Sequence, residues 1–301
     1  MFIDFSNSYS ANERGRKWTM GEEINREHKD RLFCFLFGRE ENRKWTLELY
    51  NALNGTNYLE ESDIVFNTLK DAVYMGMKND VSFLLSSVLS LYEQQSTYNP
   101  NMPVRQLMYL GKIYDKYIHQ FNLNIYGKRL IKLPVPKLVT FYNGIENHED
   151  KILRLSDSFD SDSIISESDV EVNVRMININ HERGSSLLKK CRPLYEYSWF
   201  VDRIRLNNKT MEIEPAVDKA FGDMPENFVI RKCIELNKAE VTDMCLTEYD
   251  EAKTMEMFKE EGREEGREEG REERDGEILK AIESGATIDD IKRMLVFNSK
   301  L

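Results

Sequence analysis

The amino-acid sequence predicts a mixed α/β core followed by a helical C-terminal extension. Three patterns support this prediction. Apolar residues recur at helical spacing across residues 45–53 and end at Asn54-Gly55, as in a helix with a glycine stop. Apolar and polar residues alternate across 170–176, which is the period-two signature of a half-buried strand. After Ser185 the pattern is helical almost to the end of the chain.

The first half of the core opens with an apolar segment at residues 32–37 that Gly38 closes. After the 45–53 helix comes a short β-rich segment at 64–66. Two apolar runs between residues 73 and 96 then break at Ser86-Ser87, which predicts a β-hairpin.

The second half of the core begins at Asn101-Met102-Pro103. This triplet predicts a helix start, because proline at the first helical position loses no hydrogen bond. Residues 138–142 predict a strand that ends at Asn143-Gly144, and the Ser/Asp-rich stretch at 156–169 predicts an exposed loop. The inward face of the helix is expected at Val104, Leu107, Gly111, Tyr114 and Ile118.

These segments divide the chain into five expected parts. They are a flexible lead-in at 1–27, a core at 28–210, a helical subdomain at 211–250, a charged Glu/Gly/Arg-repeat helix at 251–276 and a helical hairpin at 277–301. The repeat lacks the apolar seam of a coiled coil, so a solvated helical spacer is expected there. The final hairpin is a candidate for docking or for assembly into a homo-oligomer.

The composition describes a folded chain and excludes several classes of protein. Of the 301 residues, 41% are hydrophobic and 11% aromatic, which is more than a disordered chain carries. No stretch approaches the roughly 18 apolar residues of a membrane span, and the first residues lack an apolar signal core, so a cytoplasmic protein without membrane contact is expected. The four cysteines and four histidines lack ligand spacing, so neither zinc nor disulfides are expected.

The net charge of −11 is distributed unevenly along the chain. Residues 251–301 contain ten Lys/Arg and fifteen Asp/Glu, which is a net charge of −5. Residues 94–145 contain seven Lys/Arg and one acid, Asp115, which is a net charge of +6. Because basic side chains must neutralise phosphates when nucleic acid binds, DNA contact is expected in this second region.

The predicted hairpin brings two carboxylates together. If Ser86-Ser87 are the loop residues, Leu85 faces Val88, and counting outward places Asp80 opposite Glu93. Opposed residues share a face, with Cβ atoms about 4.5–5.5 Å apart. Two carboxylates at this spacing repel each other unless a cation lies between them, and Mg²⁺ suits such a pair.

Gln95 extends this arrangement, because it lies two residues beyond Glu93 and projects to the same face. An Asp followed by Glu-x-Gln on the next strand matches the PD-(D/E)XK nuclease pattern, with Gln at the Lys position. An amide orients a water but cannot take up a proton. Lys78 falls opposite Gln95 and is a candidate for the missing cation. The expected fold is a restriction-endonuclease-like core, a mixed sheet flanked by helices.

A simpler interpretation of the hairpin stays open. An Asp that begins a strand and a Glu that ends one are often solvated edge residues. Ser-Ser is not a preferred tight-turn pair, so a register shifted by one residue is the alternative.

Five groups of residues around the hairpin keep their order along the chain and resemble the Rpn family of recombination-promoting nucleases. This family comprises transposase-related PD-(D/E)XK proteins of bacteria, and the likeness covers residues 28–250. The groups are Lys29-Asp30-Arg31-Leu32-Phe33 with Leu36-Phe37-Gly38, Met77-Lys78-Asn79-Asp80, Leu91-Tyr92-Glu93-Gln94-Gln95-Ser96-Thr97, Met102-Pro103-Val104-Arg105, and Pro134-Val135-Pro136 with Phe141-Tyr142-Asn143-Gly144.

The resemblance implies a Mg²⁺-dependent DNA endonuclease linked to recombination or mobile elements, with Mn²⁺ as the alternative metal. By position it implies that Asp80 and Glu93 bind the metal and that Gln95 occupies the Lys position. A further acid from the first helices is common in this superfamily, and Asp30 and Glu48 are both candidates. The alternative function is a catalytically inactive DNA-binding or protein-interaction module with the same fold.

One stripe of the helix that begins at Pro103 is basic. Its members are separated by seven, four and three residues and are Arg105, Lys112, Lys116 and His119. We expect them to contact DNA phosphates, which positions DNA without reading its sequence. An ordinary solvated helix face is the alternative interpretation. Further basic residues continue the run after the helix, at Lys128, Arg129, Lys132 and Lys137.

Overall fold

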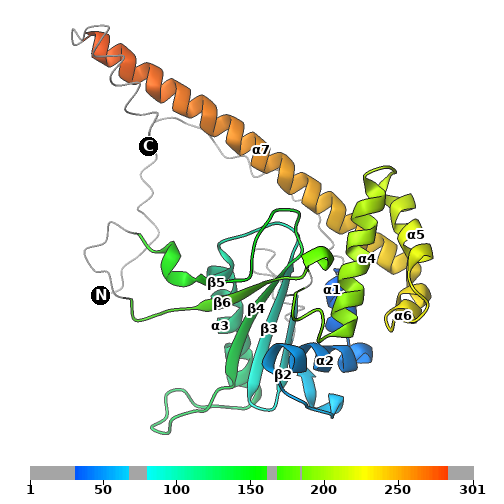
Figure 1. Cartoon of the computed structure of the whole chain (residues 1–301). Helices are drawn as coiled ribbons and strands as arrows, with labels where there is room; N and C mark the ends of the chain where they lie inside the picture. Colours follow the sequence, from blue (N-terminus) through cyan, green and yellow to red (C-terminus); the bar gives the residue numbers. More distant parts are fainter. Residues whose placement is uncertain (1–30, 68–79, 161–167, 184, 284–301) are drawn as a thin grey trace.

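The computed structural model describes residues 31–67, 80–160, 168–183 and 185–283 (Figure 1). The expected lead-in at 1–27 lies outside the described residues, as do Asp30, Lys78 and residues 284–301 of the expected hairpin. Within the described ranges, no helix combines the length and the apolar character needed to cross a membrane.

A six-stranded mixed sheet forms the centre of the molecule, in the order β1-β2-β3-β4-β6-β5 (Figure 1). The pairs β3–β4 and β4–β6 are parallel and the other pairs are antiparallel. This mixed sheet with helices confirms the predicted α/β class. The strands are β1 (Ile64–Phe66), β2 (Val81–Leu85), β3 (Val88–Gln95), β4 (Val135–Tyr142), β5 (Lys151–Arg154) and β6 (Asn173–Asn178).

Helices cover both faces of the sheet. Helix α3 connects β3 to β4 and packs on one face, whereas α1, α2 and α4 contribute to the hydrophobic cluster on the other face. The helices are α1 (Leu32–Phe37), α2 (Arg43–Asn54), α3 (Met102–Gln120), α4 (Arg192–Asn208), α5 (Ile213–Asp223), α6 (Arg231–Leu236) and α7 (Lys238–Glu283). Short 3₁₀ turns lie at Glu40–Asn42, Glu61–Asp63, Leu155–Ser158 and His181–Arg183.

The β2–β3 hairpin has the predicted register. Leu85 pairs with Val88 and Val81 pairs with Tyr92, so the one-residue shift does not occur. Ser86 adopts a left-handed conformation with φ +56°, which serine disfavours. The buried faces of the two strands require this register, because a one-residue slip would move their apolar side chains to the opposite faces.

Helix ends follow the sequence signals closely. Helix α2 ends at Asn54, and Gly55 has φ +66°, a conformation that glycine adopts without a steric penalty. Helix α3 carries Pro103 in its first turn, as expected.

The expected inward face of α3 is correct only in part. Val104, Leu107 and Tyr114 are partly buried and pack against the hydrophobic cluster, whereas Gly111 is exposed. Gln106 is fully buried. Its amide donates to the carbonyl of Val139 and to Thr140 Oγ1, each at 3.3 Å, which compensates the burial of this polar side chain. A polar residue therefore lies on the buried face, which apolar spacing alone does not detect. The buried residues of this helix are Met102, Pro103, Gln106, Tyr109 and Ile113.

Three strands differ from their predicted extents. Strand β4 begins at Val135, three residues before the predicted start at 138. The sequence pattern misses β5, a four-residue edge strand in which only Leu153 is buried. The alternation at 170–176 predicts a strand start at Val170, but β6 begins at Asn173 and Val170 is exposed. Alternation describes the residues near a strand as well as those in its ladder, so it does not locate the first paired residue.

Residues 211–250, expected as a helical subdomain, share a hydrophobic cluster with the core. Val217, Phe221 and Ile234 belong to the same hydrophobic cluster as Phe33 and Phe141. Helix α7 is continuous from 238 to 283, so the expected boundaries at 250 and 276 fall inside one helix. Its later part extends away from the sheet (Figure 1).

Phe141 tests this core, because its fully buried ring lies 5.2 Å from the ring of Phe33 and 5.4 Å from that of Tyr92, centroid to centroid. Phe141→Ala is expected to lower the free energy of unfolding by about 3–5 kcal/mol, measured by urea denaturation. Phe159→Ala, at an exposed phenylalanine, is the control and should cost less than about 1 kcal/mol. Equal losses in the two variants would contradict the assigned core.

Candidate functional site

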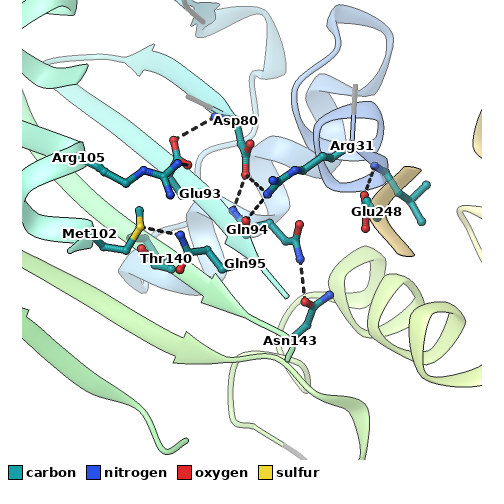
Figure 2. Close-up of polar contacts among 12 residues, drawn as sticks. Arg31, Asp80, Glu93, Gln94, Gln95, Met102, Arg105, Thr140, Asn143 and Glu248 are labelled. Carbon is teal, nitrogen blue, oxygen red and sulfur yellow. Dashed lines mark hydrogen bonds and ion pairs between the residues drawn. The ribbon is translucent and has the colours of Figure 1, made fainter. Parts of the chain in front are cut away.

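Asp80 and Glu93 lie together at the open end of the β2–β3 hairpin (Figure 2). The backbone N–H of Asp80 donates to Glu93 Oε1 at 3.1 Å. The Asp80 carboxylate in turn accepts the backbone N–H of Gln94 at 2.6 Å. The hairpin register therefore brings the two predicted acids together, each bonded to the other strand.

Glu93 is a buried acid, with only 1% of its surface exposed. It projects toward α3, on the same face as Leu89 and Leu91, which precede it at alternating positions along β3. Burial and the neighbouring Asp80 carboxylate raise the pKa of Glu93 well above its ordinary value of 4.5, against the opposing effect of Arg105. A buried carboxylate with raised pKa needs compensation by a cation or a proton.

Arg105 provides part of that compensation. Its guanidinium lies 3.5 Å from Glu93 Oε2 and donates to the hydroxyl of Tyr109 at 3.2 Å. Arg105 was predicted as a DNA contact from the helix stripe, and the structure adds that it pairs with the acidic site.

The rest of the basic stripe leads away from the acids along α3. Lys112 is partly exposed, and Lys116 and His119 are exposed. His119 lies 3.5 Å from Asp115, its neighbour one turn earlier. DNA contact by these residues stays a prediction.

Arg31 is a second cation at the site, and the sequence prediction gave it no role. Its guanidinium donates to the carbonyl of Gln94 at 2.9 Å and lies 4.0 Å from Asp80 Oδ2 (Figure 2). The signal in the sequence was the position of Arg31 directly before the apolar segment at 32–37. Because that segment must enter the core beside the hairpin, the residue before it lies near the hairpin too.

Helix α7 reaches the same region through Glu248. Glu248 Oε1 accepts the backbone N–H of Leu32 at 2.8 Å, at the first turn of α1. Burial raises the pKa of Glu248, against the opposing charge of Arg31. The start of α7 thus fixes the segment that carries Arg31.

Gln95 lies on the Glu93 face but its amide is directed to α3. Its Nε2 donates to the sulfur of Met102 at 2.7 Å (Figure 2). This leaves the amide oxygen as the atom for a water or a metal ion. On the opposite face, Gln94 donates to Asn143 at 2.7 Å, and Asn143 donates to Tyr197 at 3.2 Å.

Glu48 does not join the acidic pair. Its carboxylate accepts the backbone N–H of Arg192 at 2.8 Å, at the N-terminus of α4, where a helix presents unpaired N–H groups. The other candidate for a third acid, Asp30, lies outside the described residues. Among the residues that the structure describes, no group of three His, Cys, Asp or Glu side chains has metal-binding geometry, and the four cysteines are free thiols.

The donor chemistry of the site fits a hard divalent cation. Asp80 and Glu93 supply two carboxylates and Gln95 supplies an amide oxygen, and Mg²⁺ is commonly held by one or two carboxylates together with waters. A cation there would also offset the burial and the Asp80 repulsion that together raise the pKa of Glu93.

No family model, curated protein or solved structure matches this chain. The geometry of the site is therefore the basis for assigning a function.

The raised pKa of Glu93 predicts a pH-dependent stability. The folded protein keeps this proton at pH values where the unfolded chain has lost it, so the contribution of Glu93 to stability falls as pH rises above the ordinary pKa of 4.5. Glu93→Gln removes the ionisation. The variant should therefore gain stability relative to the wild type between pH 4 and pH 8, measured by urea denaturation.

Glu171 offers a control of opposite sign. A hydrogen bond from the Ser156 hydroxyl lowers the pKa of this exposed acid, so its contribution to stability is lost as pH falls. Glu171→Gln should lose stability relative to the wild type as pH rises. Identical pH dependence in the wild type and Glu93→Gln would contradict the account of the buried acid.

Proposed function

We propose that this chain is a Mg²⁺-dependent DNA endonuclease of the Rpn type with a PD-(D/E)XK core. The observation that carries the proposal is the Asp80–Glu93 pair, in which the buried Glu93 carboxylate accepts the backbone N–H of Asp80 at 3.1 Å across the hairpin. Gln95 on the same face completes the Asp, Glu-x-Gln pattern. A buried carboxylate beside a partly buried one is unfavourable for stability alone, which supports a role in binding a cation.

The chemistry proposed for the site uses these residues in distinct roles. A bound Mg²⁺ supplies a water of lowered pKa and positive charge beside the scissile phosphate. Asp80 and Glu93 would hold the ion, and the amide oxygen of Gln95 would orient the attacking water. Because an amide cannot take up a proton, the proton must leave through another group or through solvent.

Arg105 links the acids to the substrate in this proposal. Its side chain is one-third exposed while its guanidinium lies 3.5 Å from Glu93. Neutralisation of Glu93 by a metal ion would release this guanidinium toward a phosphate, which arginine binds in a bidentate manner. The basic stripe along α3 then extends the phosphate contacts from the site.

A catalytically inactive DNA-binding or protein-interaction module is the second candidate. Two observations favour it. Arg31 and Arg105 already offset the charges of Asp80 and Glu93, and the Lys position holds Gln95. Such a module would retain the fold and the basic stripe without hydrolysis.

Cleavage of supercoiled plasmid with and without Mg²⁺ tests the proposal. Wild type should nick the plasmid only with Mg²⁺, and Glu93→Gln should lower the rate at least about 100-fold, because it removes a metal-binding carboxylate while preserving side-chain size. Glu171→Gln, at an exposed acid two residues before β6, should retain the wild-type rate.

Full nicking by Glu93→Gln would contradict the assigned site. DNA binding by the wild type without nicking in Mg²⁺ or Mn²⁺ would favour the inactive module.

A further inference from the structure

The loop between α3 and β4, residues 121–134, exposes large apolar side chains to solvent. Tyr126 is 93% exposed, Leu130 78% and Ile125 54%. Single exposed apolar residues are common on protein surfaces, but several on one short loop indicate a contact surface.

The loop is held by specific hydrogen bonds. The side chain of Asn124 accepts the backbone N–H of Tyr126 at 3.0 Å, and its carbonyl accepts the N–H of Gly127 at 3.2 Å. Where the loop returns, the hydroxyl of Tyr114 on α3 donates to the carbonyl of Pro134 at 2.7 Å. The apolar side chains therefore project from a loop with a hydrogen-bonded turn at 124–127 and an end that Tyr114 holds on α3.

The same loop is basic. Lys128, Arg129 and Lys132 are exposed on it, and no Asp or Glu occurs between residues 116 and 145 of the sequence. Basic side chains beside exposed apolar ones match the chemistry of a DNA duplex, since Lys and Arg contact phosphates while apolar side chains insert at the minor groove between base steps.

The length of α3 sets the distance between the loop and the acidic site. Arg105, near the start of α3, pairs with Glu93, and the loop begins where α3 ends. Helix α3 has 19 residues, so at 1.5 Å per residue the two ends are about 28 Å apart. At 3.4 Å per phosphate along a strand, this corresponds to about 8 base pairs. The basic stripe, with the exposed Lys116, connects the two ends.

We propose that loop 121–134 is a second contact for duplex DNA, about 8 base pairs from the acidic site. Its basic residues hold the phosphate backbone, and Tyr126 and Leu130 lie against the bases at the minor groove. The inference rests on the proposed function, because it takes DNA as the ligand and Asp80 and Glu93 as the other end of the contact. It adds a minimum substrate length that the acidic site alone does not require.

Binding of two labelled duplexes, one of about 6 base pairs closed as a hairpin and one of about 24 base pairs, tests the inference by fluorescence anisotropy in EDTA. Only the longer duplex reaches both the acids and the loop, so the wild type should bind it at least about tenfold more tightly. The triple variant Lys128→Ala/Arg129→Ala/Lys132→Ala should lose most of this advantage, and its log–log salt slope should fall by about 2–3.

Tyr126→Ala separates the apolar contact from the charge. It should lower affinity for the longer duplex about five- to tenfold, leave the salt slope unchanged and leave the shorter duplex unaffected. Lys189→Ala/Lys190→Ala and Leu206→Ala are the matched controls, since they remove exposed basic and apolar side chains elsewhere. Both controls should bind both duplexes as the wild type does.

Several results would overturn the inference. In the first, the loop variants bind the longer duplex as tightly as the wild type does. In the second, the wild type binds neither duplex. In the third, Tyr126→Ala changes sedimentation or binding to anionic vesicles but does not change DNA binding. Glu93→Gln should keep the length-dependent binding. Absence of plasmid nicking by the wild type with this binding intact would reject the nuclease proposal but not the second contact.

Discussion

The burial of the Glu93 carboxylate is the constraint on which the rest of the site depends. An ionised carboxylate inside a protein is costly unless cations and hydrogen bonds compensate it. Here the compensation comes from the N–H of Asp80 across the hairpin and from Arg105 at the start of α3. The hairpin register and the placement of α3 against the sheet are therefore both tied to one acidic side chain.

The same region shows why the average charge of the chain is a poor guide to its partners. Acidic residues concentrate in the last fifty positions, whereas the α3 stripe and the following loop are basic. The stripe begins at Arg105, which lies beside the Glu93 carboxylate. Arg31 and Glu248 add a connection from this site to the first turn of α1 and the third turn of α7. Elements distant in sequence thus meet at the edge of the hairpin.

Local patterns predicted the parts of this architecture that depend on nearby residues. The hairpin register and the pairing of Asp80 with Glu93 follow from the position of Ser86-Ser87, and helix ends follow from Gly55 and Pro103. The roles of Arg31 and Glu48 depend on partners far along the chain, so spacing could not assign them. The buried Gln106 escaped prediction because its burial depends on hydrogen bonds to β4.

The central claim is that Asp80 and Glu93 together bind a divalent cation. Isothermal titration of the full chain with Mn²⁺ tests it most directly, because binding is measured without DNA or turnover. The account predicts about one ion per chain with proton release, since the raised pKa of Glu93 must fall when the metal binds, and loss of binding in Glu93→Gln. Equal Mn²⁺ binding by the wild type and Glu93→Gln, or none by the wild type, would contradict it.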